Sequence, residues 1–164
     1  NENSLDVKYI INTHGHHDHI AFDDELSKTT GAIVCVHKDD LSLLSQPFDN
    51  LSFFSGEEFR VQTDKIELED NQILELDDIK IQIIHTPGHT KGSISLLMEN
   101  KLFTGDLLFK NSVGRTDFIG GSFEELQESL KRISLLPDST EVYPGHGPET
   151  TLIEEKRNNP YLNI

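Results

Sequence analysis

The chain has 164 residues, enough for one hydrophobic core and too few for two ordinary domains, so we expect a single domain over residues 1–164. Its 35% apolar and 26% charged residues are typical of a globular protein, and with no membrane-length apolar run and no visible signal peptide we expect it to be cytoplasmic. The 14 basic and 29 acidic residues give a net charge of −15, which disfavours nucleic acid and anionic membranes as partners.

The first predicted element is a short strand over residues 8–12, which leads into Thr-His-Gly-His-His-Asp-His at 13–19. Imidazole and carboxylate groups bind zinc, and they also suit iron and manganese. Because residues i and i+2 of an extended chain share a face, His14 and His16 can bind one ion together. Asp18 and His19 follow the turn and point elsewhere, so one loop can serve two adjacent ions. A histidine-rich surface loop or an expression tag is the disfavoured alternative, because a tag has no strand before it.

The next segments predict alternating helices and strands. A helix is expected over 22–30 with Gly31 as its stop, then a strand over 32–36, then a short helix over 38–44. The strand holds Cys35, the single cysteine, which we expect to be a buried small hydrophobe. Residues 48–64 lack periodicity, and we expect either a loop that covers a site or a loop whose aromatic side chains anchor it to the core.

Five short strands follow, at 66–68, 73–76, 79–84, 94–98 and 101–103, with hairpin turns expected at 77–78 and 99–100. A capping box and an apolar stripe predict a helix over 122–136, and a last short helix is expected over 151–157.

Three later strands each lead into a glycine-containing turn that carries one histidine or aspartate. The turns are Thr-Pro-Gly-His-Thr at 86–90, Thr-Gly-Asp at 104–106 and Tyr-Pro-Gly-His-Gly at 143–147. Four strand-end segments thus supply seven candidate metal ligands: His14, His16, Asp18, His19, His89, Asp106 and His146.

These motifs, with the loop at 113–118 and the tail Asn-Pro-Tyr-Leu at 159–162, resemble the metallo-β-lactamase-fold hydrolases, most closely the small type II glyoxalase-like members. The resemblance covers nearly all of the chain and implies an α/β (α+β) fold of the αββα sandwich type. Family members normally begin with several strands before the first histidine motif, whereas thirteen residues precede His14 here. We therefore expect a sandwich that is incomplete at the N-terminus, with an open sheet edge that invites pairing with another chain.

The resemblance implies a cofactor of two divalent ions, with Zn²⁺ expected and Fe or Mn as alternatives. The first ion would be held by His14, His16 and His89, the second by Asp18, His19 and His146, and Asp106 would bridge both. Three histidines are left over. We expect His17 beside a ligand or exposed, His37 as a capping or surface group, and His85 either orienting a ligand or packing in the core.

The resemblance implies hydrolysis of a small thioester such as S-lactoylglutathione by a metal-bound bridging hydroxide, with Asp18 and Asp106 as the catalytic residues that hold and orient it. Arg115 could bind a substrate carboxylate or pair with Asp117 to stiffen the loop. Glutathione recognition itself is not supported, because Lys156 and Arg157 are the only basic residues after His146.

Two other interpretations stay open. One is a mononuclear non-haem iron persulfide dioxygenase of the same fold, which shares the Gly-Arg-Thr-Asp loop; the other is a partner-dependent fragment that is inactive alone. A lactamase is disfavoured by the loop around Arg115 and by the Tyr-Pro-Gly-His-Gly-Pro segment at 143–148.

Overall fold

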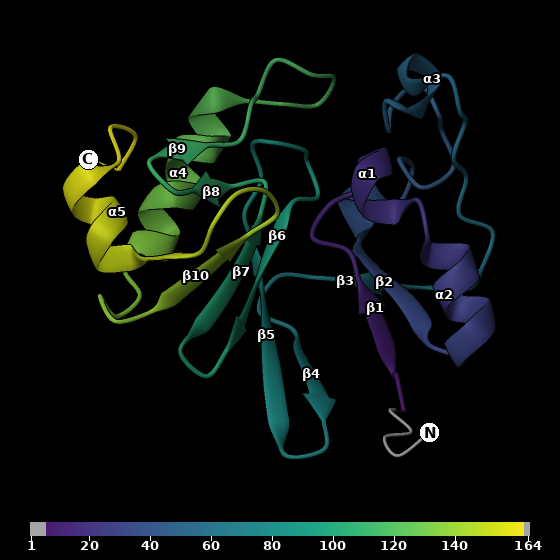
Figure 1. Ribbon diagram of the computed structural model, residues 1–164, viewed down its shortest axis with the longest axis horizontal. Helices are drawn as coiled ribbons and strands as arrows, with labels where there is room; N and C mark the ends of the chain where they lie inside the picture. The colour runs from purple at the N-terminus through teal and green to yellow at the C-terminus, as the bar shows by residue number, and fades with distance from the viewer. Residues whose placement is uncertain (1–5, 163–164) are drawn as a thin grey trace.

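The computed structural model describes residues 6–162, which form two packed sheets with helices on their outer faces (Figure 1). Helices α4 (Phe123–Ser134) and α5 (Leu152–Asn158) cover one sheet, and α2 (Asp23–Thr30) covers the other. The expected α/β class and the helix–sheet–sheet–helix order are confirmed. The ends of the predicted domain, residues 1–5 and 163–164, lie outside the described residues.

The smaller sheet is parallel and has the strand order β1 (Tyr9–Ile11), β2 (Ile33–His37), β3 (Lys65–Leu68). Its residues alternate between two faces, as strand geometry requires. Val34 and Val36 face the helices, whereas Cys35 packs against the other sheet and is fully buried, which confirms its predicted burial. Among the described residues, β1 pairs only with β2, so its second edge has no strand partner.

The larger sheet has the order β11-β10-β7-β6-β5-β4. Its strands are β4 (Ile73–Leu76), β5 (Ile79–His85), β6 (Ile94–Met98), β7 (Lys101–Gly105), β10 (Glu141–Pro144) and β11 (Thr150–Thr151). Both predicted two-residue hairpin turns are confirmed, and each begins with a left-handed residue, Asp77 at φ 52° and Glu99 at φ 55°. Strand β10 runs parallel to β7, which brings the ends of these two strands together.

Two apolar layers hold the sheets in place. Between the sheets, Leu68, Ile83 and Ile94 are fully buried around Cys35. On the other face of the larger sheet, α4 buries one stripe that includes Leu126, Leu130 and Ile133. The predicted capping box is confirmed in part, because the Ser122 hydroxyl accepts the Glu125 N–H at 3.3 Å and so fixes the start of α4.

Two sequence expectations need correction, and that for His37, a capping or surface group, is confirmed as a capping group. The predicted helix over 38–44 is only a 3₁₀ turn at Lys38–Asp40 followed by further turns, because its main-chain hydrogen bonds span three residues rather than four. The loop over 48–64 contains a one-turn helix, α3 (Ser52–Ser55). His37 caps the 3₁₀ turn by accepting the Asp39 N–H, but at 2% exposure it is not a surface group.

The first histidine segment ends in another short helix, α1 (His17–Ile20), and a small hairpin of β8 (Leu108–Phe109) and β9 (Ser112–Val113) follows β7. Within residues 6–162, none of the helices has the length and apolarity that a membrane crossing would need.

Candidate metal centre

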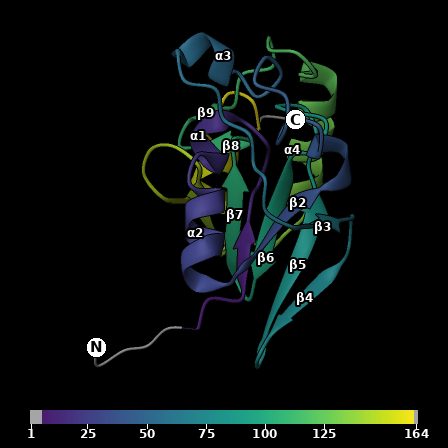
Figure 2. The ribbon, with the colours of Figure 1, turned by 90° about the vertical axis from the view of Figure 1, so that its right-hand side faces the viewer.

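The seven predicted ligands come from strand ends that meet at one end of the molecule, beside α1 (Figure 1). His14 and His16 follow β1, while Asp18 and His19 lie within the four-residue helix α1. The remaining three follow β5, β7 and β10 of the larger sheet: His89, Asp106 and His146. Strands of both sheets run towards this end and the α3 segment lies above it (Figure 2). Residues up to 132 positions apart therefore share one site.

A first group consists of His14, His16 and His89, which are exposed by only 1%, 3% and 3%. One ligand atom from each lies within 4.8 Å of the others. The three rings are close to mutually perpendicular, with interplanar angles of 84–89°. Three imidazole nitrogens gathered in this way can hold a single ion.

A second group consists of Asp18, His19 and His146, and it is more open to solvent. His146 Nε2 lies 3.2 Å from Asp18 Oδ2, and His19 Nε2 lies 3.7 Å from the same oxygen. The side chain of His146 is 56% exposed. One group is thus enclosed by protein and its neighbour faces outward.

Asp106 lies between the two groups. Its Oδ2 is 3.6 Å from His89 Nε2 and 3.7 Å from His146 Nε2, and its Oδ1 is 3.5 Å from His19 Nε2. Its carboxylate therefore reaches both groups, as the predicted bridging role requires.

Several buried atoms of the cluster have no hydrogen-bond partner within residues 6–162: the Nε2 atoms of His14, His16 and His19 and Oδ1 of Asp106. Buried polar atoms are almost always paired, because an unpaired one costs about 1–3 kcal/mol. Burial also lowers the pKa of His16 to about 3 and holds that of His14 well below its usual range. Both rings are consequently neutral near pH 7, with lone pairs available, and the donor set fits divalent ions.

The orientation of the first group is fixed by contacts behind it. His89 Nδ1 donates to the main-chain carbonyl of Arg115 at 2.7 Å, which leaves Nε2 directed into the cluster. Asp40 is fully buried and accepts hydrogen bonds from Gly15 N at 2.9 Å, Thr90 Oγ1 at 2.6 Å and Gly92 N at 2.7 Å. One carboxylate therefore joins the two loops that carry the first group.

Asp40 was not predicted to support the site. The signal in the sequence was a carboxylate shortly after a buried strand: Asp40 lies three residues beyond the end of β2, whereas Asp106 directly follows β7.

Two glycines allow the close approach of these loops. A Cβ at Gly114 would lie 1.7 Å from the main-chain oxygen of Asp106, and one at Gly145 would lie 2.4 Å from Asp106 Oδ1. No side chain fits at either position, so both glycines are required by space rather than by backbone conformation.

The predicted supporting residues have different surroundings. The Arg115 Nε and Nη2 groups donate to the two carboxylate oxygens of Asp117, each at 2.7 Å, and the guanidinium lies 3.8 Å from the ring centre of Phe118. This is the pairing role considered for Arg115. His85 instead hydrogen-bonds the Lys91 carbonyl at 2.8 Å and stacks on His37, so its ring nitrogen contacts no predicted ligand.

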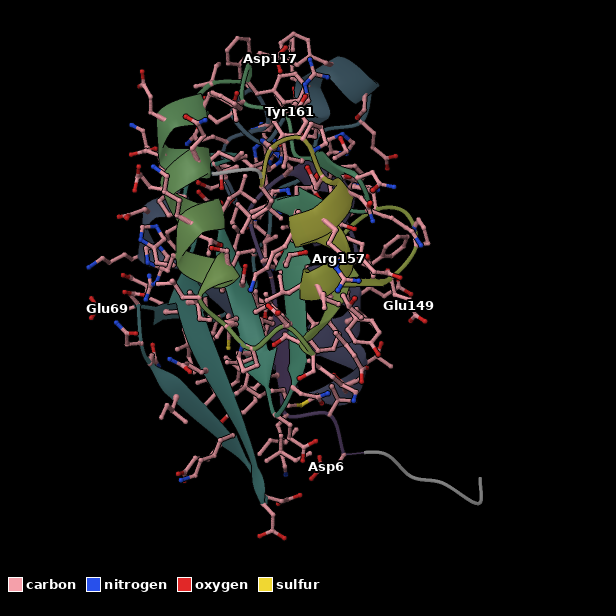
Figure 3. The ribbon with its side chains drawn as sticks, turned by 90° about the vertical axis from the view of Figure 1, so that its left-hand side faces the viewer. Asp6, Glu69, Asp117, Glu149, Arg157 and Tyr161 are labelled. Carbon is pink, nitrogen blue, oxygen red and sulfur yellow. The ribbon has the colours of Figure 1, made fainter. Side chains whose placement is uncertain are left out.

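A pocket of about 680 Å³ adjoins the cluster and has a size typical of small-molecule sites. Its polar end is formed by His16, Asp18, His89 and Asp106, and the partly buried His17 also lines it. Asp117 belongs to its wall, and Figure 3 shows Asp117 at the end of the molecule where the strand ends meet, away from Arg157 on α5.

Comparison with known proteins agrees with this architecture. Residues 1–146 match the family model of the metallo-beta-lactamase superfamily. Hydroxyacylglutathione hydrolase GloC of Haemophilus influenzae is 37% identical over 168 residues, which cover 99% of this chain and 79% of GloC. The crystal structure of the BLEG-1 B3 metallo-beta-lactamase matches with a TM-score of 0.92 and 36% identity, over 98% of this chain and 79% of BLEG-1. The structure of TTHA1623 in a di-iron-bound form matches with a TM-score of 0.83 and 36% identity, over 93% of this chain and 76% of TTHA1623. This chain therefore belongs to the metallo-beta-lactamase superfamily.

Proposed function

We propose that the chain hydrolyses thioesters with the help of two divalent metal ions, expected to be Zn²⁺. The observation that carries the proposal is the convergence of seven ligand side chains around four buried atoms that lack protein partners within residues 6–162. The similarity to GloC, whose name describes hydrolysis of a hydroxyacyl thioester of glutathione, supports the same reaction class.

The chain would hold one ion with His14, His16 and His89, another with Asp18, His19 and His146, and would share Asp106 between them. Ions bound there would supply Lewis acidity for the substrate carbonyl and would lower the pKa of water enough to make it nucleophilic at neutral pH.

The protein side chains then position the reactants. Asp18 lies on the pocket wall, where its carboxylate can accept a hydrogen bond from the attacking water and take up its proton. Asp106, at 13% side-chain exposure, fixes the distance between the two groups. Water adds to the thioester carbonyl and the carbon–sulfur bond breaks, which gives a carboxylate and a thiol; one proton of the water goes to the thiol and the other is released to solvent.

A persulfide dioxygenase is the second candidate. His14, His19 and Asp106 form a further group whose ligand atoms lie within 4.8 Å, and two histidines with one carboxylate are the donor set of mononuclear iron oxygenases. The di-iron form of TTHA1623 shows that this fold can hold iron.

Metal analysis of the purified chain, followed by assays with S-lactoylglutathione and with glutathione persulfide, separates the candidates. Two ions per chain with release of thiol would support the proposal. One iron per chain with oxygen uptake on the persulfide would overturn it. Hydrolysis of a β-lactam without any thioester turnover would also overturn it, in favour of the activity named for BLEG-1.

The same preparation tests the idea of a partner-dependent fragment. A chain that melts cooperatively and turns over a thioester unaided is not such a fragment. A chain that does so only after addition of a second polypeptide supports pairing through the edge of β1 that has no strand partner within residues 6–162.

A further inference from the structure

The pocket beside the metal centre has two chemically different parts. The polar part of its wall belongs to the cluster, whereas the rest includes the apolar side chains of Leu51, Phe54, Phe118 and Ile119, with the Phe118 ring 5.9 Å from that of His16. Phe54 and Ile119 both line this pocket and are 65% and 57% exposed, so the wall presents large apolar side chains to solvent. Such a wall gains stability when an apolar group covers it.

The charged side chains on the pocket wall also favour an uncharged ligand group. Among the described residues, Arg115 is the one arginine or lysine on the pocket wall, and its Nε and Nη2 groups donate to the two carboxylate oxygens of Asp117. The other charged groups on the wall are carboxylates, of Asp18, Asp106 and Asp117. With three carboxylates against one guanidinium that already pairs with Asp117, the wall disfavours a carboxylate or phosphate of a ligand.

The position of the pocket distinguishes the two ends of a thioester. The pocket meets the cluster at His16 and His89, whereas His19 and His146 do not line it. A thioester with its carbonyl at the cluster therefore has one substituent in the pocket and the other on the open side next to His146. Biological thiols are polar and charged, which suits the open side, so the acyl substituent belongs in the pocket.

We propose that this pocket selects thioesters whose acyl group is an uncharged apolar chain, such as butyryl or hexanoyl, over small polar acyl groups such as lactoyl. The inference rests on the proposed thioester hydrolysis, because the carbonyl must lie at the cluster for the acyl chain to reach Phe54 and Ile119.

The test uses the metal-loaded chain and N-acetylcysteamine thioesters of acetate, lactate, butyrate and hexanoate, with thiol release as the readout. Burial of a methylene corresponds to about a fourfold gain, and the half-open wall lowers this, so we expect kcat/KM to rise about two- to fourfold for each methylene. Equal rates across the series, or faster turnover of the lactoyl substrate than of hexanoyl, would overturn the inference while leaving thioester hydrolysis in place. Absence of turnover for every thioester would instead overturn the proposed function.

A pair of variants locates the effect. Phe54→Ser should reduce kcat/KM by a factor that grows with acyl length, so that the slope of the series flattens. Phe22→Ser is a matched control, because Phe22 is 66% exposed and does not line the pocket. In the Phe22→Ser variant, kcat/KM should rise with acyl length as steeply as in the unmodified chain. The inference is wrong if both variants flatten the slope equally, or if Phe54→Ser leaves it unchanged.

Discussion

The molecule contains two histidine clusters that differ in one essential respect. In the metal centre, the Nε2 atoms of His14, His16 and His19 have no partner within the described part of the chain. At the other cluster, His37 and His85 also come within reach of a carboxylate, that of Asp39. There, however, His37 Nδ1 accepts the Asp39 N–H, and His85 hydrogen-bonds the Lys91 carbonyl.

Ring orientation separates the clusters further. The His37 and His85 rings stack with centroids 4.0 Å apart and an angle of 12°, so their lone pairs lie in nearly parallel planes and do not converge. The first-group rings are near 90° to one another, and their ligand atoms lie within 4.8 Å of one another. Proximity of donors is therefore a weak criterion for a metal site, whereas unpaired buried nitrogens are a strong one.

The largest expected effect is that of Asp106→Ala, because this carboxylate contacts both groups. We expect loss of metal from both positions and a fall in kcat/KM of more than about 100-fold, measured by elemental analysis and thioester turnover. Asp39→Ala, which removes the carboxylate of the other cluster, is the control and should change neither quantity. Retention of two ions by Asp106→Ala would contradict the central position given to this residue.

His16→Ala and His37→Ala test the comparison directly. Removal of the His16 imidazole should reduce the metal content by one ion per chain. His37→Ala should keep the full metal content and lower the free energy of unfolding by about 1–2 kcal/mol, because a buried capping group is lost. Elemental analysis measures the metal content of both variants, and thermal melting measures the loss of stability in His37→Ala. A loss of metal in His37→Ala would mean that the ligand set is misassigned.

Asp40→Asn sharpens the comparison within the metal centre itself. The amide cannot accept all three hydrogen bonds from Gly15, Thr90 and Gly92, so the two loops of the first group should separate slightly. We expect the first ion to bind about tenfold more weakly and the second to be nearly unaffected. Competition with a chromophoric chelator measures both affinities, and Asp39→Asn is the neighbouring exposed control. Equal weakening of both ions would show that Asp40 acts on general stability instead.

Asp23 extends the comparison to a buried carboxylate with one side-chain partner, the amide of Asn12 at 2.6 Å. Burial raises the pKa of Asp23 to about 6 from its ordinary value of 3.8, so the folded state holds the proton more tightly. The free energy of unfolding that Asp23 contributes therefore falls as the pH rises from about 3.8 to about 6. Above that range the destabilisation caused by the buried charge stays constant.

Asp23→Asn removes this ionisation, and it should have the smallest effect in the series. With chelator present, the variant should gain about 1–2 kcal/mol at pH 8 and almost nothing at pH 3.5, measured by urea unfolding. A larger gain at low pH than at high pH would contradict the burial argument. Metal content under metal-replete conditions should stay that of the unmodified chain.

The sequence could predict whatever depends on local patterns. Strand-end turns identified all seven members of the cluster, and the hairpins at Asp77 and Glu99 follow from their short turns. In place of the helix expected over 38–44 there are turns with three-residue hydrogen bonds, and the contacts of Asp40 there with Thr90 and Gly92 are long-range, so no local pattern reports them. For the same reason, the partner of His85 could not be predicted, since it depends on the fold of the Lys91 loop.

The two sheets contribute to one site, with His14 and His16 from the end of β1 and His89 and Asp106 from the ends of β5 and β7. An ion bound there would act as a cross-link between the two halves of the sandwich. Each tenfold gain in affinity would then add about 1.4 kcal/mol to the resistance of the fold to unfolding, at a fixed saturating concentration of free ion. Evolutionary selection for higher metal affinity would thus also have selected a protein that is more stable against unfolding.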